Sequence, residues 1–177
     1  MRNLSSVPGE TRPVRASTHR AFVLSRRYEE AITESRKSLE LDPDYWLALW
    51  FQGQALEQLG RYAEALPPLK KGHMALADNP SVLVAEEARV YALSGRRADA
   101  LRTLDQLMAM SKRTQVSKYA IASVYMALGD KDQAFARLNQ ACAERSVNLE
   151  FLKVAPELDV LRSDTRFQDL VRKLNLP

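Results

Sequence analysis

Cysteine, histidine and long apolar runs are nearly absent from this chain. Its 177 residues include one cysteine, Cys142, and two histidines, His19 and His73, so an internal disulfide is excluded and a cysteine-rich zinc site is untenable. No window approaches the roughly 20 apolar residues of a membrane-spanning helix, and the first residues lack the apolar core of a secretory signal. The sequence therefore predicts a soluble, cytoplasmic protein that contacts no membrane.

The motifs of common enzyme classes are missing as well. The chain has no glycine-rich phosphate loop, no GxSxG, no HExxH and no CxxC. Adjacent carboxylates such as Glu86 and Glu87 point about 100° apart on a helix, so they do not form a catalytic pair. His73 and Cys142 fall on apolar helix stripes, where packing explains them. We expect no enzymatic activity, no cofactor and no metal site.

The positive charge is concentrated at the N-terminus. Residues 1–27 hold six arginines and one acid, Glu10, whereas the other 150 residues carry 20 basic and 21 acidic side chains. An arginine-rich arm can bind phosphates. Because Pro8 and Pro13 interrupt this stretch and the remainder is almost neutral, we interpret residues 1–13 as a flexible, solvated basic arm and expect no nucleic-acid partner.

What the chain does contain is a pattern that recurs. Trp46 to Leu76 has the apolar spacing of two amphipathic helices joined at a short turn. Four such units align, with a turn residue and then, five residues later, an alanine, at spacings of 34, 35 and 34: Arg26/Ala31, Gly60/Ala65, Gly95/Ala100 and Gly129/Ala134. A small side chain is needed there because crossing helices approach to about 8 to 10 Å.

This pattern resembles the tetratricopeptide repeat, a helix-turn-helix unit of 34 residues. The resemblance implies an all-α fold, a right-handed α-solenoid of such repeats with a C-terminal capping helix. The expected parts are the arm at 1–13, a degenerate first repeat at 14–45, repeats at 46–80, 81–114 and 115–148, and a capping segment at 149–177. Helices are expected near 28–40, 44–59, 62–77, 81–94, 97–110, 115–128, 131–145 and 164–174.

Two local features modify this expectation. Pro67 and Pro68 fall in the second turn of an expected helix, which we therefore expect to start late or to kink. The last helix has one apolar stripe, Phe167, Leu170, Val171 and Leu174, behind the N-cap candidate Asp164. A helix with one apolar stripe can cover the exposed apolar face of the final repeat and still present polar side chains to solvent. This tail also resembles the ends of tetratricopeptide arrays in bacterial signalling and regulatory proteins.

The N-terminal edge of the array has no such cover in the sequence. In the register of the later repeats, Arg15, Thr18 and His19 fall at core positions, whereas the apolar residues 21–24 remain to be covered. Either residues 14–26 fold back as an imperfect first helix, or the edge pairs with a second copy about a two-fold axis. We favour the homodimer.

The resemblance also implies a concave groove that binds a partner. Carried over position by position, its lining is Leu47, Trp50, Gln54, Glu57, Val82, Arg89, Tyr119, Ser123 and Met126. The Lys/Asn/Arg clamp that some members use for a peptide carboxylate is absent, since the corresponding positions hold Ala16, Arg20, Phe51, Val82 and Glu86.

These residues lead to two functional hypotheses. The first is a non-catalytic adaptor or scaffold whose groove takes a segment of a protein partner by apolar contact, with Gln54 and Arg89 orienting it. The alternative is a structural module that packs against copies of itself or against an effector protein. In that interpretation, Trp50 and Tyr119 are covered by the chain's own tail or by a neighbouring helix.

Overall fold

The computed structural model describes residues 12–76, 78–145 and 147–174, and every regular element among them is helical. The described residues include no helix long and apolar enough to cross a membrane. The elements are α1 (Arg12–Leu24), α2 (Tyr28–Leu41), α3 (Trp46–Gln58), α4 (Tyr62–Ala75), α5 (Ser81–Leu93), α6 (Arg97–Met110), α7 (Lys118–Ala127), α8 (Lys131–Ala143), the 3-10 helices η1 (Val147–Phe151) and η2 (Pro156–Leu161), and α9 (Thr165–Lys173).

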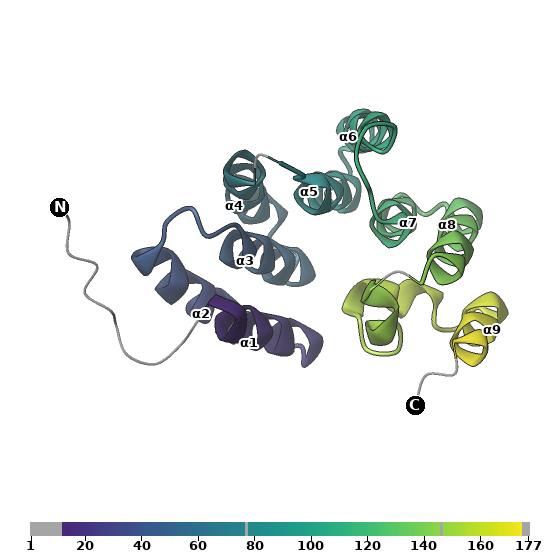
Figure 1. The fold of residues 1–177 in the computed structure, drawn as a ribbon, viewed down its shortest axis with the longest axis horizontal. Coiled ribbons are helices and arrows are strands. Elements are labelled where there is room, and N and C mark those ends of the chain that lie inside the picture. Colours follow the sequence, from purple (N-terminus) through teal and green to yellow (C-terminus); the bar gives the residue numbers. More distant parts are fainter. Residues whose placement is uncertain (1–11, 77, 146, 175–177) are drawn as a thin grey trace.

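Consecutive helices pack in pairs and the pairs stack into an arc (Figure 1). The first helices of the pairs also contact one another, α1 with α3, α3 with α5 and α5 with α7, so they form one continuous inner layer. Helices α4, α6 and α8 lie on the outer side of the arc. The predicted all-α solenoid is confirmed.

Small residues set the distance between the two helices of each pair. The four alanines that define the repeat, Ala31, Ala65, Ala100 and Ala134, are all 0% exposed. Gly53 shows the same constraint from the facing helix, because a Cβ added there would lie 2.4 Å from Leu69 Cδ2. Each helix crossing therefore depends on a position without a long side chain.

The turns within the pairs share one backbone conformation. Gly60, Gly95 and Gly129 have φ values of 71°, 80° and 80°, in the left-handed region that glycine adopts without steric penalty. Arg26 stands at the equivalent place in the first pair and has a φ of 61°. Its guanidinium forms an ion pair with Asp159 at 2.8 Å, so the first turn is tied to the C-terminal segment.

The N-terminal edge is closed by α1, which packs on α2 and α3. His19 occupies a core position at 1% exposure, where its ring stacks on Phe51 with a centroid distance of 6.0 Å and its Nε2 lies 3.3 Å from Ser38 Oγ. Val23 is also buried. The structure thus has the first of the two predicted arrangements, a folded-back helix, whereas homodimerisation stays a prediction. Most of the expected arm, residues 1–11, lies outside the described residues.

The C-terminal segment does more than cover the last repeat. Phe167 and Leu170 of α9 are buried in one cluster with Leu138 and Ala141 of α8, as a capping helix requires. Asp164 accepts a hydrogen bond from the Arg166 amide at 3.0 Å. Before α9, however, η1 and η2 turn inward, and η2 packs against α7 on the inner side of the arc (Figure 1).

The proline pair does not delay its helix. Helix α4 begins at Tyr62 and contains Pro67 and Pro68 in its interior. Of the two predicted outcomes, the late start is wrong, whereas a kink stays a prediction. Leu69 directly after the prolines is 0% exposed, and Ala65 before them is equally buried. Burial of this face against α3 and α5 holds the helix in place although two backbone donors are missing.

The alanine positions provide a test of the helix crossings. Replacing Ala100 with Leu should lower the free energy of unfolding by about 1 to 3 kcal/mol, because the added side chain overpacks a crossing with no free space. Ala98→Leu makes the same change at an exposed position of the same helix and should leave the stability nearly unchanged. Urea denaturation measures the free energy of unfolding of both variants. Equal effects of the two substitutions would contradict the assigned packing.

Candidate binding pocket on the concave face

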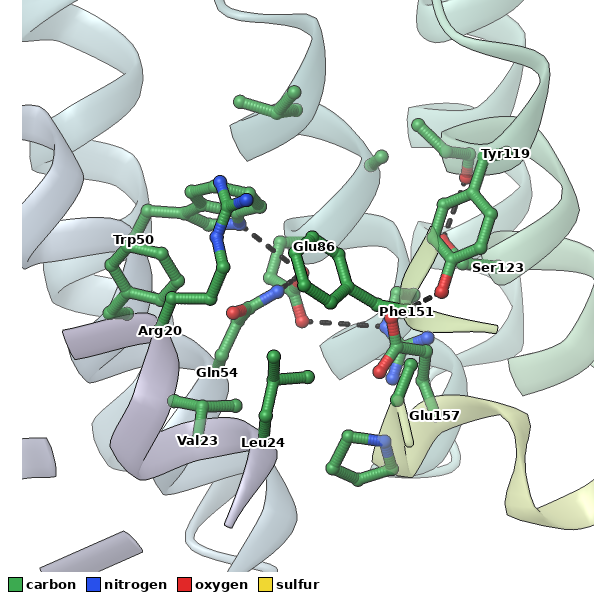
Figure 2. Close-up of a pocket in the computed structure, with 17 residues that line it drawn as sticks. Arg20, Val23, Leu24, Trp50, Gln54, Glu86, Tyr119, Ser123, Phe151 and Glu157 are labelled. Atoms are coloured by element: carbon green, nitrogen blue, oxygen red, sulfur yellow. Dashed lines mark hydrogen bonds and ion pairs between the residues drawn. The ribbon is translucent and has the colours of Figure 1, made fainter. Parts of the chain in front are cut away.

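A cavity of about 80 Å³ lies on the concave side, where α1, α3, α5 and α7 face η1 and η2 (Figure 2). This volume corresponds to roughly five water molecules or the end of one side chain. Its aromatic walls are Trp50, Phe51, Tyr119 and Phe151, and its polar lining is Arg20, Gln54, Glu86, Arg89, Ser123 and Glu157.

The inner helices bring most of the predicted groove residues to this cavity. The lining includes Trp50, Gln54, Val82, Arg89, Tyr119 and Ser123. Three of the predicted residues do not line it. Glu57 is buried behind Arg89, Met126 is buried in the C-terminal core, and Leu47 is half-buried against the N-terminal core. On the first helix of each pair, the residues that face the inside of the arc therefore reach the cavity. Those that face a neighbouring helix are buried in the core instead.

Arg89 is the centre of a buried ion network. Its Nε and Nη2 donate to the two carboxylate oxygens of Glu57 at 3.1 and 2.5 Å, and its Nε lies 3.4 Å from Glu86 Oε1. Burial alone would lower the pKa of Arg89, but attraction to Glu57 and Glu86 outweighs burial and raises it. Its charge is thus met inside the chain, so Arg89 is not free to orient an acidic partner in this conformation.

Glu86 is the second carboxylate beside that single guanidinium. Its Oε2 accepts hydrogen bonds from the Gln54 amide at 3.1 Å and from the Trp50 indole nitrogen at 3.4 Å. Burial disfavours its charged form, and Glu57 repels it, so the pKa of Glu86 rises to about 8 although Arg89 acts in the opposite direction. Burial and the nearby Glu57 therefore favour the protonated form of Glu86 near neutral pH.

The chain's own tail covers the other side of the pocket. Tyr119 is buried, and its hydroxyl donates to Glu157 Oε1 of η2 at 2.7 Å. Burial and the nearby Glu157 both raise the pKa of Tyr119. The alternative interpretation of Tyr119, burial by the tail, is therefore correct. Trp50 differs, since it is only half-buried and lies at the cavity.

Helix α1 meets the tail at the side of the pocket that we call its mouth. The Arg20 guanidinium is 5.1 Å from the centroid of the Phe151 ring, and Figure 2 draws both side chains among those that line the pocket. Leu24 packs against the C-terminal core cluster. Sequence analysis did not identify Phe151 or Glu157 as part of a site, because the repeat pattern stops before them and only folding brings them to the inner helices.

Nothing in the described part of the chain suggests a metal centre, since it contains no group of three or more histidine, cysteine or acidic side chains placed to hold an ion. The pocket offers hydrogen-bond acceptors, aromatic faces and one partly exposed guanidinium. Such a lining can recognise a ligand through contact, charge and shape.

The pKa of Glu86 predicts a pH-dependent stability. Because that pKa lies above its ordinary value of 4.5, the folded state holds a proton that the unfolded state releases, and stability falls as the pH rises toward and through 8. Between pH 6 and pH 9 the loss from this group should be about 2 to 3 kcal/mol.

Glu86→Gln keeps an oxygen acceptor for Trp50 and Gln54 but does not titrate, so it should remove that part of the pH dependence. Glu40→Gln makes the same change at an exposed position and serves as the control. Urea denaturation at pH 6, 7, 8 and 9 measures all three proteins. Parallel curves for the wild type and Glu86→Gln would contradict the assigned environment.

The comparisons with known proteins agree with this architecture. Family models of the tetratricopeptide repeat match residues 20–72 and 117–146. Two solved structures of a Podosopora anserina putative kinesin light chain with nearly identical TPR-like repeats, one of them a single-residue variant, superpose with TM-scores of 0.52. They are 17% and 16% identical, and the matches cover 91% of this chain and 91% and 92% of theirs.

This similarity shows the fold. No curated protein matches the chain. The resemblance of the tail to bacterial signalling arrays stays a prediction. The buried repeat alanines, the left-handed turns and the matched family models all indicate the same helix-turn-helix repeat. The chain therefore contains tetratricopeptide repeats, which the family models match at residues 20–72 and 117–146.

Proposed function

We propose that this chain is a protein-interaction module that holds one segment of a partner protein over the concave-face pocket. Tetratricopeptide repeats generally mediate protein-protein interaction, and this fold presents its inner helix layer for that purpose. The observation that carries the proposal is a cavity walled by half-buried Trp50 and Phe151 at the centre of that layer. Aromatic side chains beside a cavity are typical anchors of an interface.

The size of the cavity limits how the partner binds. About 80 Å³ accepts the end of one side chain and is far too small for a helix. The tail already occupies the concave side next to α7, where η2 covers Tyr119. The partner segment therefore lies across the mouth between α1 and η1 and inserts one side chain, instead of filling a long groove.

The homodimer expected at the N-terminal edge has less to support it, because α1 covers that edge and buries His19 and Val23 against its neighbours. Phe22 is half-buried and has the Arg27 guanidinium 4.7 Å from its ring centroid. The homodimer stays a prediction, which sedimentation equilibrium tests.

A display selection from a random peptide library tests the interaction function without a known partner. Peptides enriched on the wild type should bind Trp50→Ala at least ten-fold more weakly, since this change removes an aromatic wall of the cavity. Ala120→Leu should weaken the same peptides by narrowing the cavity from α7. Isothermal titration measures each affinity.

Met74→Ala is the matched control, because Met74 is 83% exposed on α4, outside the cavity lining. Circular dichroism must show unchanged helical content for all three variants. If the selected peptides bind Trp50→Ala and Ala120→Leu as tightly as the wild type, the pocket is not the binding site. If no peptide is enriched at all, the proposed function is wrong.

A further inference from the structure

One carboxylate of the pocket has no cation as a partner. Glu86 from α5 and Glu157 from η2 line the pocket, Glu57 from α3 lies behind its wall, and the buried cation beside them is Arg89. Arg89 is paired with Glu57 and Glu86. Among the described residues, no cation lies within ion-pair distance of Glu157, whose hydrogen-bond donor is the Tyr119 hydroxyl. Glu157 therefore gives the pocket a carboxylate that no described cation meets in an ion pair.

The walls add a second feature that favours cations. Four aromatic rings, those of Trp50, Phe51, Tyr119 and Phe151, line a cavity that holds only the end of a side chain. Aromatic faces attract ammonium and guanidinium groups. The chain itself gives an example, because the Arg20 guanidinium lies 5.1 Å from the Phe151 ring centroid at the mouth.

From this geometry we propose that the pocket takes a lysine or arginine side chain of the partner segment, with its cation directed toward Glu86 and Glu157. The inference rests on the proposed function and specifies the chemistry of the inserted residue. The stem of such a side chain contacts Trp50 and Phe151, while its charged end reaches the carboxylates.

The other ligand classes fit less well. An acidic side chain would meet the carboxylates of Glu86 and Glu157, and the guanidinium of Arg89 that could attract it is already bound to Glu57. An apolar side chain would displace water from Glu157 without supplying a hydrogen bond or a counter-charge, which is unfavourable for a carboxylate. A cation supplies both.

Binding of a cation should also be coupled to a proton. The charged and titratable groups that face Glu86 are Glu57 of α3, Arg89 of its own helix, Tyr119 of α7, Glu157 of η2 and, at the mouth, Arg20 of α1. A bound cation favours ionised Glu86, so affinity should rise as the pH increases from 6 to 9. A lysine side chain, with an ordinary pKa of about 10.4, remains largely charged over this range.

The experiment uses the pocket-dependent peptides from the display selection. In each peptide, the residue whose replacement by alanine costs most affinity is changed in turn to Lys, Met and Glu. The lysine form should bind the wild-type protein at least ten-fold more tightly than the methionine form, and the glutamate form should bind most weakly. Titrations at pH 6 and pH 9 should show tighter binding of the lysine form at pH 9.

Three protein variants test how the charges of Glu157 and Arg20 each affect peptide binding. Glu157→Gln keeps an acceptor for Tyr119 but removes the charge, so it should weaken the lysine peptide at least five-fold without weakening the methionine peptide. Glu40→Gln, an exposed change of the same kind, should alter neither. Arg20→Ala should tighten the lysine peptide, because it removes the chain's own cation from the mouth.

The outcomes distinguish the two proposals. Pocket-dependent peptides that prefer methionine or glutamate, or that lose affinity with Arg20→Ala, would overturn the cation inference and leave the interaction function standing. A lysine preference that Glu157→Gln does not change would overturn it as well. If no peptide depends on Trp50 and Ala120, both proposals fall together.

Discussion

The close crossing of two helices at a small residue is the constraint on which this structure depends. Ala65 is fully buried at its crossing, and at Gly53 the Leu69 side chain fills the space that a Cβ would take, so the two helices approach closely. Repetition of that crossing along the chain stacks the pairs and places every first helix on the inner side of the arc. The pocket lies where this curved inner layer faces η1 and η2.

Within the layer, polar burial is concentrated at one place. Glu57, Glu86 and Arg89 lie under the pocket, where the desolvation of each charge is offset by the others only in part. Apolar side chains at these positions would stabilise the solenoid without the cost of removing charges from water. Perturbed carboxylates concentrate at functional sites, and the position of these residues beside a cavity with aromatic walls is one reason why we propose this pocket as the binding site.

The tail converts an open arc into a pocket. The segment η1 to η2 brings Phe151 and Glu157 to the inner face, and the ion pair between Arg26 and Asp159 joins the first turn to the same segment. Helix α1 and the C-terminal segment thus both border the mouth of the pocket. In an array without such a tail, the inner helices would present a wide shallow surface, and a partner could lie along it at full length.

The sequence by itself determined the repeat. The spacing of the alanines and turn residues follows from the geometry of single helices and from the packing of each helix on the next one along the chain. It placed α2 to α9 within a few residues and put six of the nine predicted residues at the pocket. Tertiary structure alone decided that Arg89 is paired internally and that η2 covers Tyr119. Those outcomes depend on contacts between residues more than 30 positions apart, and no local pattern encodes such contacts.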